Sequence, residues 1–473
     1  MGLQQQLKFK ALSTFGKAVA FFTGSLRMVC AVFLSVLFSA SRLFLRLNCH
    51  SSIWTGAPFR KLAVVLVAAL SSSILQAQSL DQGSQENLRN GSPSFNIYSY
   101  DFSGLPGSSS RSTLSQIGVE NGKRPIVLKY KFGLSGRSFA DERDQAQTAG
   151  LAIGSQVRVP LLNNLDFVGS LRVNLESGHA QSRFGDNVPR NGIYLKEAVL
   201  QSQWGEPFVV LAGAIDQSRL RLPFLFAESA FPGLMENIDW SYENSGSGLS
   251  LESVYFRAEQ VIPSSVSEGT AGENAESVPW LLTEETGVQL AGPSQLRGEL
   301  RAGHYRFQGL SNKVAEKSEI LGNSVFESSA SESNFIYEFE GWFAGLNLKW
   351  KVTPVIDLRG STLMIQNLRA PESFRNAQLQ TLGLDWKTSG GLKISPSVDT
   401  FFAESDVSPA AYSSAEFGHN NRTGWGARLA VSLDHDRLVI DTHYVDANII
   451  NSSLTQSRQQ YFMIKVETPY EVL

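Results

Sequence analysis

Polar side chains, many of them charged, alternate with apolar ones in several stretches of about ten residues, and this spacing is the main chemical signal of the chain. In residues 165–176 the odd positions are apolar except for Gly169, whereas Asp166, Arg172 and Glu176 stand among the even positions. A β-strand points successive side chains to opposite faces, so such a stretch has one apolar face and one charged face. The same alternation recurs in residues 355–366, 391–402 and 423–433.

The charged faces carry both signs in nearly equal numbers. The basic side chains assigned to these faces are Arg158, Arg172, Arg297, Arg301, Lys349, Arg359, Lys387, Lys393 and Arg428. The acidic side chains are Asp166, Asp239, Glu243, Glu299, Asp357, Asp385, Asp399 and Asp441. If the apolar faces point to lipid, these residues line a water-filled interior, because charges at such density require a high dielectric or a partner. Charges along a pore select the solutes that pass.

One segment, 218-SRLRLPFLFAESAFPGLMEN-237, combines large apolar side chains with Pro223, Pro232 and Gly233, which interrupt regular structure. Each large apolar side chain left in water would forgo roughly 1.5–3 kcal/mol of burial. The large apolar side chains, among them Phe224, Phe226, Phe231 and Met235, therefore need a surface to pack against. If that surface is the inner wall of a barrel, as the family resemblance described below implies, the charged residues that face the channel and constrict it are Asp216, Arg219, Arg221, Glu228 and Glu236. Packing at a subunit interface or on a neighbouring loop, or a plain solvent-exposed loop, would be the alternatives.

Sixteen stretches with strand character follow one another between residues 126 and 468. They are 126–134, 150–159, 165–176, 193–204, 208–216, 236–244, 249–258, 284–290, 296–308, 334–350, 355–366, 378–387, 392–402, 423–433, 437–447 and 459–468. After the first strand, the connections alternate between long and short. The short ones are rich in Gly, Pro, Asn and Asp, as turns are. In 334–350 the apolar phase slips near Gly341, which indicates a bulge or a hidden turn.

Alternating loop lengths and an even strand count predict an all-β fold, a transmembrane antiparallel up-and-down β-barrel with short periplasmic turns and long extracellular loops. Strands of roughly 9–11 residues are long enough to cross a bilayer. Closure removes exposed edges and pairs every backbone polar group. A barrel of about 16 strands is also wide enough for an aqueous channel. A soluble β-protein is the alternative.

This organisation resembles the outer-membrane porins of Gram-negative bacteria, the trimeric 16-stranded superfamily, over roughly residues 126–473. The resemblance rests on architecture, and no motif assigns a subfamily. It implies a homotrimeric diffusion channel for small hydrophilic solutes or ions, with outer-membrane lipids and the barrel assembly machinery as partners. It also implies a third long loop that folds inwards and narrows the channel, which is residues 217–235 by count. The basic residues that would orient solutes across from acidic constriction residues are Arg158, Arg172, Arg359 and Arg428.

The first 77 residues differ in composition from the rest of the chain. They hold eight basic residues, no acidic residue and both cysteines, whereas the rest has 33 basic and 44 acidic residues. Arg60 and Lys61 precede an apolar run that ends before a possible cleavage site at Ala77, as in a signal peptide. We expect a leader over 1–77, with the signal peptide at about 59–77 and a mis-called start upstream, and localisation in the outer membrane of a Gram-negative bacterium. Residues 78–125 are expected to form a periplasmic segment or a plug, and 126–473 the barrel.

The ends of the predicted strands carry aromatic residues. Trp204, Trp240, Trp350 and Trp386 lie near strand ends, where amphipathic rings favour the membrane interface. The last predicted strand is followed by Pro469 and does not end the chain, which departs from the porin pattern of a final aromatic residue. A short tail beyond the last strand is therefore expected.

No motif for catalysis or for a cofactor stands out. Five histidines, His179, His304, His419, His435 and His443, are scattered, and none pairs with a carboxylate at metal-ligand spacing on a confident helix. We expect no enzyme activity, no cofactor, no metal site and no nucleic-acid partner. A plugged or ligand-binding barrel, such as a receptor or adhesin, is the main alternative to a porin. An outer-membrane lipase is a weaker one, because His443 alternates with inward-facing positions.

Overall fold

The computed structural model describes residues 125–472, except for 143, 182–190, 206, 228, 243–249, 264–277, 293–294, 330–331 and 389. The leader, its expected cleavage site at Ala77 and the segment 78–124 lie outside the described residues. Within the described part of the chain, no helix is both long and apolar enough to cross a membrane.

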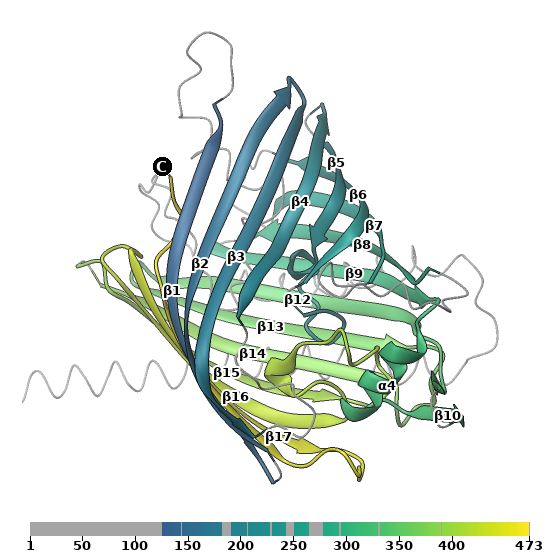
Figure 1. Cartoon of the computed structure of the whole chain (residues 1–473). Helices are drawn as coiled ribbons and strands as arrows, with labels where there is room; N and C mark the ends of the chain where they lie inside the picture. Colours follow the sequence, from purple (N-terminus) through teal and green to yellow (C-terminus); the bar gives the residue numbers. More distant parts are fainter. Residues whose placement is uncertain are drawn as a thin grey trace, which may run out of the picture. The chain divides into compact units, whose positions relative to one another are not determined.

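Sixteen antiparallel strands form one closed sheet (Figure 1). They are β1 (Val127–Asp141), β2 (Gln145–Leu162), β3 (Leu165–Gln181), β4 (Gly192–Trp204), β5 (Phe208–Asp216), β6 (Ala230–Ser241), β7 (Ser250–Val261), β8 (Trp280–Ala291), β9 (Leu296–Gln308), β12 (Glu340–Thr353), β13 (Ile356–Asn367), β14 (Asn376–Lys387), β15 (Lys393–Ala403), β16 (Arg422–Leu433), β17 (Leu438–Ile449) and β18 (Gln459–Glu467). Each overlaps one predicted stretch. The predicted 16-stranded up-and-down barrel is therefore confirmed.

The first and last strands close the sheet. β1 pairs with β18 from Gly133 opposite Glu467 to Asp141 opposite Gln459, and it pairs with β2 along its other edge. Each remaining barrel strand pairs with the barrel strands before and after it, and β9 pairs directly with β12. Closure leaves the barrel without a free edge strand, so every strand has backbone partners on both sides.

The connections lie at two ends of the barrel, which we call the long-loop end and the short-turn end. Most long-loop connections are substantial, and the one between β9 and β12 holds α4 (Asn312–Ile320) and the small hairpin of β10 (Val325–Ser329) and β11 (Glu332–Phe335). The first long connection is shorter than predicted, because β1 and β2 continue until three residues separate them. The phase slip near Gly341 is a hidden turn: β11 ends at Phe335 and β12 begins at Glu340.

The outer face of the barrel is largely apolar. On β3, Leu171 and Leu175 are 43% and 54% exposed, and they alternate with inward-facing Asp166, Ser170 and Arg172. The four tryptophans Trp204, Trp240, Trp350 and Trp386 lie on outward positions near the short-turn ends of β4, β6, β12 and β14. Such a ring of aromatic side chains is typical of the interface between lipid and water.

The chain continues past the last barrel strand. Thr468 N donates to the Phe132 carbonyl, and β19 (Glu471–Val472) then pairs with Lys129 and Tyr130 of β1. The predicted tail is therefore a continuation of the closing strand after Pro469. Tyr470 lies under the Lys131 ammonium, 5.2 Å from the ring centroid.

Candidate channel constriction

The loop between β5 and β6 is bound to the inner wall through its backbone carbonyls. It begins with the short helix η2 (Gln217–Leu220), whose N-terminus is capped by the Asp216 carboxylate. The Arg301 guanidinium on β9 donates to the carbonyls of Leu220 and Arg221, and Arg257 on β7 donates to the Arg219 carbonyl. In Figure 1 the teal segment that follows β5 lies within the ring of strands. The loop thus folds against the inner wall.

Five side chains, four of them buried and Arg221 largely so, surround the point where the loop meets the wall, and we call them the anchor cluster. They are Arg221 from the loop, Tyr255 from β7, Glu285 from β8, and Glu299 and Arg301 from β9. Arg221 donates through both Nη atoms to Glu299, whose side chain is fully buried, and the Nη1 to Oε2 distance is 2.8 Å. Two guanidinium groups and two carboxylates balance one another, which offsets the desolvation of each charge.

Hydrogen bonds tie the anchor cluster together beyond its ion pairs. The Tyr255 hydroxyl lies 2.7 Å from Glu285 Oε1 and 3.0 Å from Glu299 Oε1. Asn347 on β12 donates to Glu299 Oε2 at 2.8 Å. Burial disfavours the charged form of Arg221, but the ion pair and hydrogen bonds with Glu299, together with the nearby Glu285 carboxylate, outweigh it. They hold the pKa of Arg221 above its usual range. Arg221 also has a left-handed backbone with φ of 55°, a conformation that persists only where the surroundings enforce it.

The apolar side chains of the loop pack into the largest hydrophobic cluster of the barrel. Phe224 contacts the rings of Phe401 and Phe417 with centroids 6.5 and 5.5 Å away, and Phe226 lies 6.1 Å from Phe307. Phe224 and Phe226 of the loop, and Phe231 and Met235 at the start of β6, are all at most 4% exposed. The loop thus buries the side chains that would otherwise face water.

A second loop, 404–421 between β15 and β16, packs against the first. Ala227 N donates to the Tyr412 carbonyl, and Ser414 N donates to the Pro223 carbonyl. This second loop is itself held by buried amides: Asn323 and Asn420 both donate to the carbonyls of Ser405 and Ser408. Two loops joined by backbone hydrogen bonds therefore lie side by side inside the long-loop half of the barrel.

The inner wall of the short-turn half carries a ladder of ion pairs. Asp357 on β13 binds Lys387 at 2.9 Å and Lys349 at 3.7 Å. Asp385 binds Arg359 at 2.9 Å and Lys393 at 3.6 Å. Arg428 pairs with Asp441, and His443 Nε2 lies 3.7 Å from Asp399. Apart from Asp399, which binds Thr381 and lies near His443, the residues predicted to line the wall from Lys349 to Asp441 are thus paired with one another across neighbouring strands.

The wall formed by β1–β3 differs from the wall under the docked loop, and we call its inward side chains Lys131, Arg137, Arg158, Arg172 and Glu176 the polar arc. Lys131 pairs with Glu467 at 3.4 Å, Arg137 pairs with Glu176, and Arg158 Nε donates to Asp166 at 2.7 Å. The side chains of Lys131, Arg137 and Arg158 are 26–35% exposed, whereas that of Arg301 is 3% exposed. The inner charges of the polar arc are therefore partly exposed, as are Lys349 and Lys387 near the short-turn end, whose side chains are 37% exposed.

Several predicted site residues lie away from the docked loop. Arg297 pairs with Glu252 at 3.5 Å near the short-turn end, and the Asp239 amide donates to the Pro207 carbonyl there. Glu228 and Glu243 lie outside the described residues. Within the docked loop itself, Arg219 pairs with Glu197 on β4.

The assignment of Glu236 to the channel side is wrong. The Pro-Gly pair suggested a loop as far as Met235, but β6 begins at Ala230 and includes both Pro232 and Gly233. Gly233 fits this strand because an added Cβ would lie 2.3 Å from the Gln260 carbonyl oxygen. Glu236 is exposed and alternates with buried Met235 and Asn237, so it faces outwards.

Sequence reasoning missed Tyr255 and Glu285 of the anchor cluster and the neighbouring Asn347. It also missed Glu197 as the partner of Arg219. Glu285 shares its strand face with Thr283 and Gly287, so strand alternation alone could have placed it inwards. The second loop, 404–421, carried a weaker signal, since its many Ser, Asp and Asn residues also fit a solvated turn.

No family model matches the chain, and no curated protein matches it in sequence. Its structure is similar to OprB of Pseudomonas putida at high pH, with 14% identity, a TM-score of 0.44, and coverage of 73% of this chain and 93% of that one. It is similar to the in-vitro folded, trimer form of the outer-membrane protein OmpT of Vibrio cholerae, with 9% identity, a TM-score of 0.42, and coverage of 73% and 99%.

The structure is also similar to OmpF of Salmonella typhi in complex with daunomycin, with 10% identity, a TM-score of 0.41, and coverage of 72% and 97%. The relation concerns fold, which the strand order of this chain establishes by itself. The chain is a closed 16-stranded antiparallel β-barrel.

Proposed function

We propose that this protein is an outer-membrane porin that forms a water-filled channel for passive diffusion of small hydrophilic solutes or ions. One observation carries the proposal: the loop between β5 and β6 is bound to one side of the inner wall, while the charges of the polar arc remain partly exposed opposite it. Charges that line a water-filled barrel attract or repel solutes according to sign.

The same loop narrows the channel in this proposal. Its apolar side chains pack towards β9 and β15, so its polar edge, with Asp216 and Arg219, is the part that solutes pass. Arg219 is paired with Glu197 across this edge. The loop 404–421 adds to the side of the barrel that the first loop covers. The route that solutes take therefore runs off-centre, along the polar arc.

The barrel is proposed to reside in the outer membrane as a homotrimer, surrounded by lipids and inserted by the barrel assembly machinery after cleavage near Ala77. The exposed apolar outer face supports contact with lipid, and closure of the sheet leaves no free edge strand there. The long-loop end would face the cell exterior and the short-turn end the periplasm.

Single-channel recording tests the proposal. The full-length chain, expressed in a Gram-negative host and purified as that host processes it, is added to a planar bilayer at several salt concentrations. Stepwise conductance, in groups of three for a trimer, is expected. A folded barrel that gives no steps would overturn the porin and favour the plugged or ligand-binding alternative.

The position of the constriction has its own test, which uses the absence of cysteine after residue 77. Cysteine is introduced at Arg219, at the loop edge, and at Ala212, an outward position of β5. A water-soluble cationic thiol reagent is expected to lower the current of Arg219→Cys and leave Ala212→Cys unchanged. Equal responses, or none at Arg219→Cys, would place the constriction elsewhere. Deletion of 223–227, which leaves β6 intact, should enlarge each step.

A further inference from the structure

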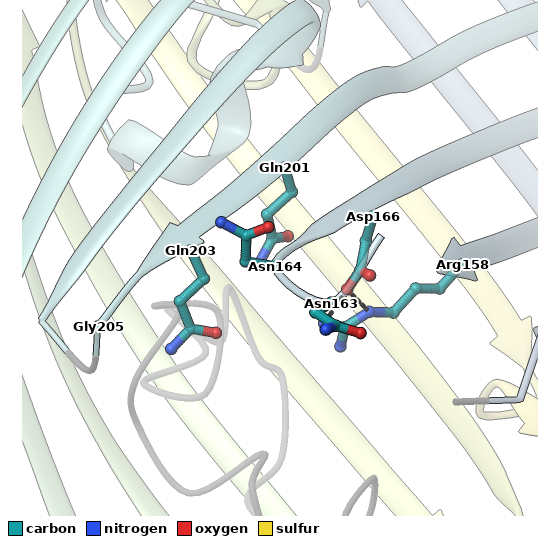
Figure 2. Close-up of a pocket in the computed structure, with 7 residues that line it drawn as sticks. All are labelled: Arg158, Asn163, Asn164, Asp166, Gln201, Gln203 and Gly205. Atoms are coloured by element: carbon teal, nitrogen blue, oxygen red, sulfur yellow. Dashed lines mark hydrogen bonds and ion pairs between the residues drawn. The ribbon is translucent and has the colours of Figure 1, made fainter. Parts of the chain in front are cut away.

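A polar pocket opens at the short-turn end of the inner wall, away from the docked loop (Figure 2). Its cavity volume is about 170 Å³, which is below the roughly 300–1,000 Å³ of sites that bury a drug-sized ligand and fits a small solute or part of a larger one. Its lining comes from β2, β3, β4 and the two turns between β2 and β5: Arg158, Asn163, Asn164, Asp166, Gln201, Gln203 and Gly205. Figure 2 shows the carboxamides of Gln203, Asn163 and Asn164 around the same space.

The backbone fixes these side chains on the inner side of the barrel. Gln201 and Gln203 follow Val199 at alternate positions of β4, and Val199 is 1% exposed within the barrel's core. Gln203 N donates to the Asn164 carbonyl at 2.9 Å, which joins the turn after β2 to the end of β4. Gly205 turns the chain into β5 with φ of 69°, a backbone that favours glycine. The pocket is therefore built by paired strands and tight turns.

The lining has a specific chemistry: four carboxamides and one neutralised ion pair. Each Asn or Gln side chain offers two N–H donors and one carbonyl acceptor with two lone pairs. Arg158 donates through Nε and Nη2 to Asp166 Oδ2, so the only two charged groups of the lining cancel each other. An ion gains no net attraction here, whereas a hydroxyl group can both donate and accept.

We propose that this pocket is a subsite for uncharged, polyhydroxylated solutes at the short-turn mouth of the channel. The inference rests on the proposed function, because it names a solute class for the same channel. A solute leaving the narrow part beside the polar arc would reach this pocket before the exit. Weak binding is expected, since each new hydrogen bond replaces one made to water.

Three open-chain C6 probes of similar size separate the possibilities: sorbitol is neutral, gluconate is anionic and N-methyl-D-glucamine is cationic. Each is added to one side of a bilayer that holds single channels, and the current reduction is measured against concentration. Sorbitol is expected to reduce the current most, and at lower concentration from the short-turn side. A stronger response to gluconate or to N-methyl-D-glucamine would overturn the solute class.

Variants locate the site. Gln203→Leu and Gln201→Leu are each expected to weaken the sorbitol response by roughly two- to twelvefold, the effect of one lost hydrogen bond. Gln156→Leu, on the same inner wall but outside the pocket lining, is the matched control and should leave it unchanged. Asp166→Asn leaves the Arg158 charge unbalanced and should shift the preference to gluconate. An unchanged sorbitol response in both glutamine variants would overturn the site.

A binding measurement keeps the subsite testable independently of conduction. Saturation-transfer NMR of sorbitol is recorded with the detergent-solubilised full chain, its fold checked by circular dichroism. Transfer to sorbitol that is lost in Gln203→Leu supports the subsite even if the channel proves silent, in which case only the porin proposal fails. No transfer with the folded wild type overturns the subsite even if the channel conducts.

Discussion

Two arcs of the same inner wall, built from the same alternating strands, have opposite character. The polar arc on β1–β3 carries ion pairs that remain partly exposed. The facing wall, towards the long-loop ends of β9, β13 and β15, carries buried apolar side chains that include Phe307, Leu363 and Phe401. We call this second region the packed arc.

The difference shows that strand alternation determines which side chains point inwards, but not whether they meet water. On the packed arc, the loops 217–229 and 404–421 cover the inner wall, so apolar residues are favoured on both faces of the same strands. Where the described loops leave the wall open, inward positions are charged. The inner face of this barrel is therefore partly a protein core and partly a channel lining.

The largest expected effect comes from breaking the anchor cluster that holds the loop to the packed arc. Glu299→Ala would leave Arg221 without its carboxylate partner and remove a negative charge near buried Arg301, which should destabilise the fold by about 3–5 kcal/mol. Urea unfolding of the refolded barrel, followed by tryptophan fluorescence, measures the change. Adding Arg221→Ala should restore part of the loss, and full additivity of the two changes would contradict a coupled pair.

Removing one aromatic side chain from the packed arc should have the next largest effect. Phe224 is 1% exposed between Phe401 and Phe417, so Phe224→Ala is expected to lower the free energy of unfolding by about 3 kcal/mol. Phe326→Ala in the β10 hairpin, where the ring is 60% exposed, is the control and should change it by under about 0.5 kcal/mol. Similar losses in both variants would argue against a packed loop.

A change on the polar arc should instead affect selectivity with little effect on stability. Arg172→Ala removes a positive charge whose Nε donates to Asn174 at 2.8 Å. A charge beside water is worth about 1 kcal/mol at short range, so the relative permeability to cations should rise up to roughly fivefold. The reversal potential across a KCl gradient measures this shift. A large loss of stability with no change in reversal potential would mean that Arg172 belongs to a packed region.

Acid should weaken the packed arc slightly. Burial, helped by Arg422 and Lys317, lowers the pKa of His419 in the loop 404–421 from 6.5 to about 4. The folded state therefore disfavours the protonated ring, so stability is complete above about pH 6.5 and declines as pH falls towards 4. Hydrogen exchange of this loop at pH 7 and pH 5 measures the change, and His419→Gln should reduce the difference. If the loop is less protected at pH 7 than at pH 5, after correction for the intrinsic pH dependence of amide exchange, the predicted direction of the pH effect is wrong.

Sequence patterns were sufficient for the strands and insufficient for the loops. All sixteen strands could be found because alternation is a local property, and inward positions such as Asp357 and Arg428 followed from the same period. The packing of loop 404–421 onto Pro223 and Ala227 could not be found in this way. It joins segments about 190 residues apart, and their residue types also fit a solvated turn. Glu236 was misplaced because Pro232 and Gly233 resemble a loop, whereas here they begin a strand.

The seam between the first and last strands has a consequence for assembly. β1 has 15 residues and β18 has nine, so β19 is needed to continue the pairing down to Lys129. The paired residues of this seam are more than 300 positions apart in sequence, and such a contact carries the largest loop-closure entropy in the barrel unless the intervening hairpins form first. We therefore expect pairing at the seam to be a slow, late step of folding. The pairing of β19 with Lys129 and Tyr130 extends this contact.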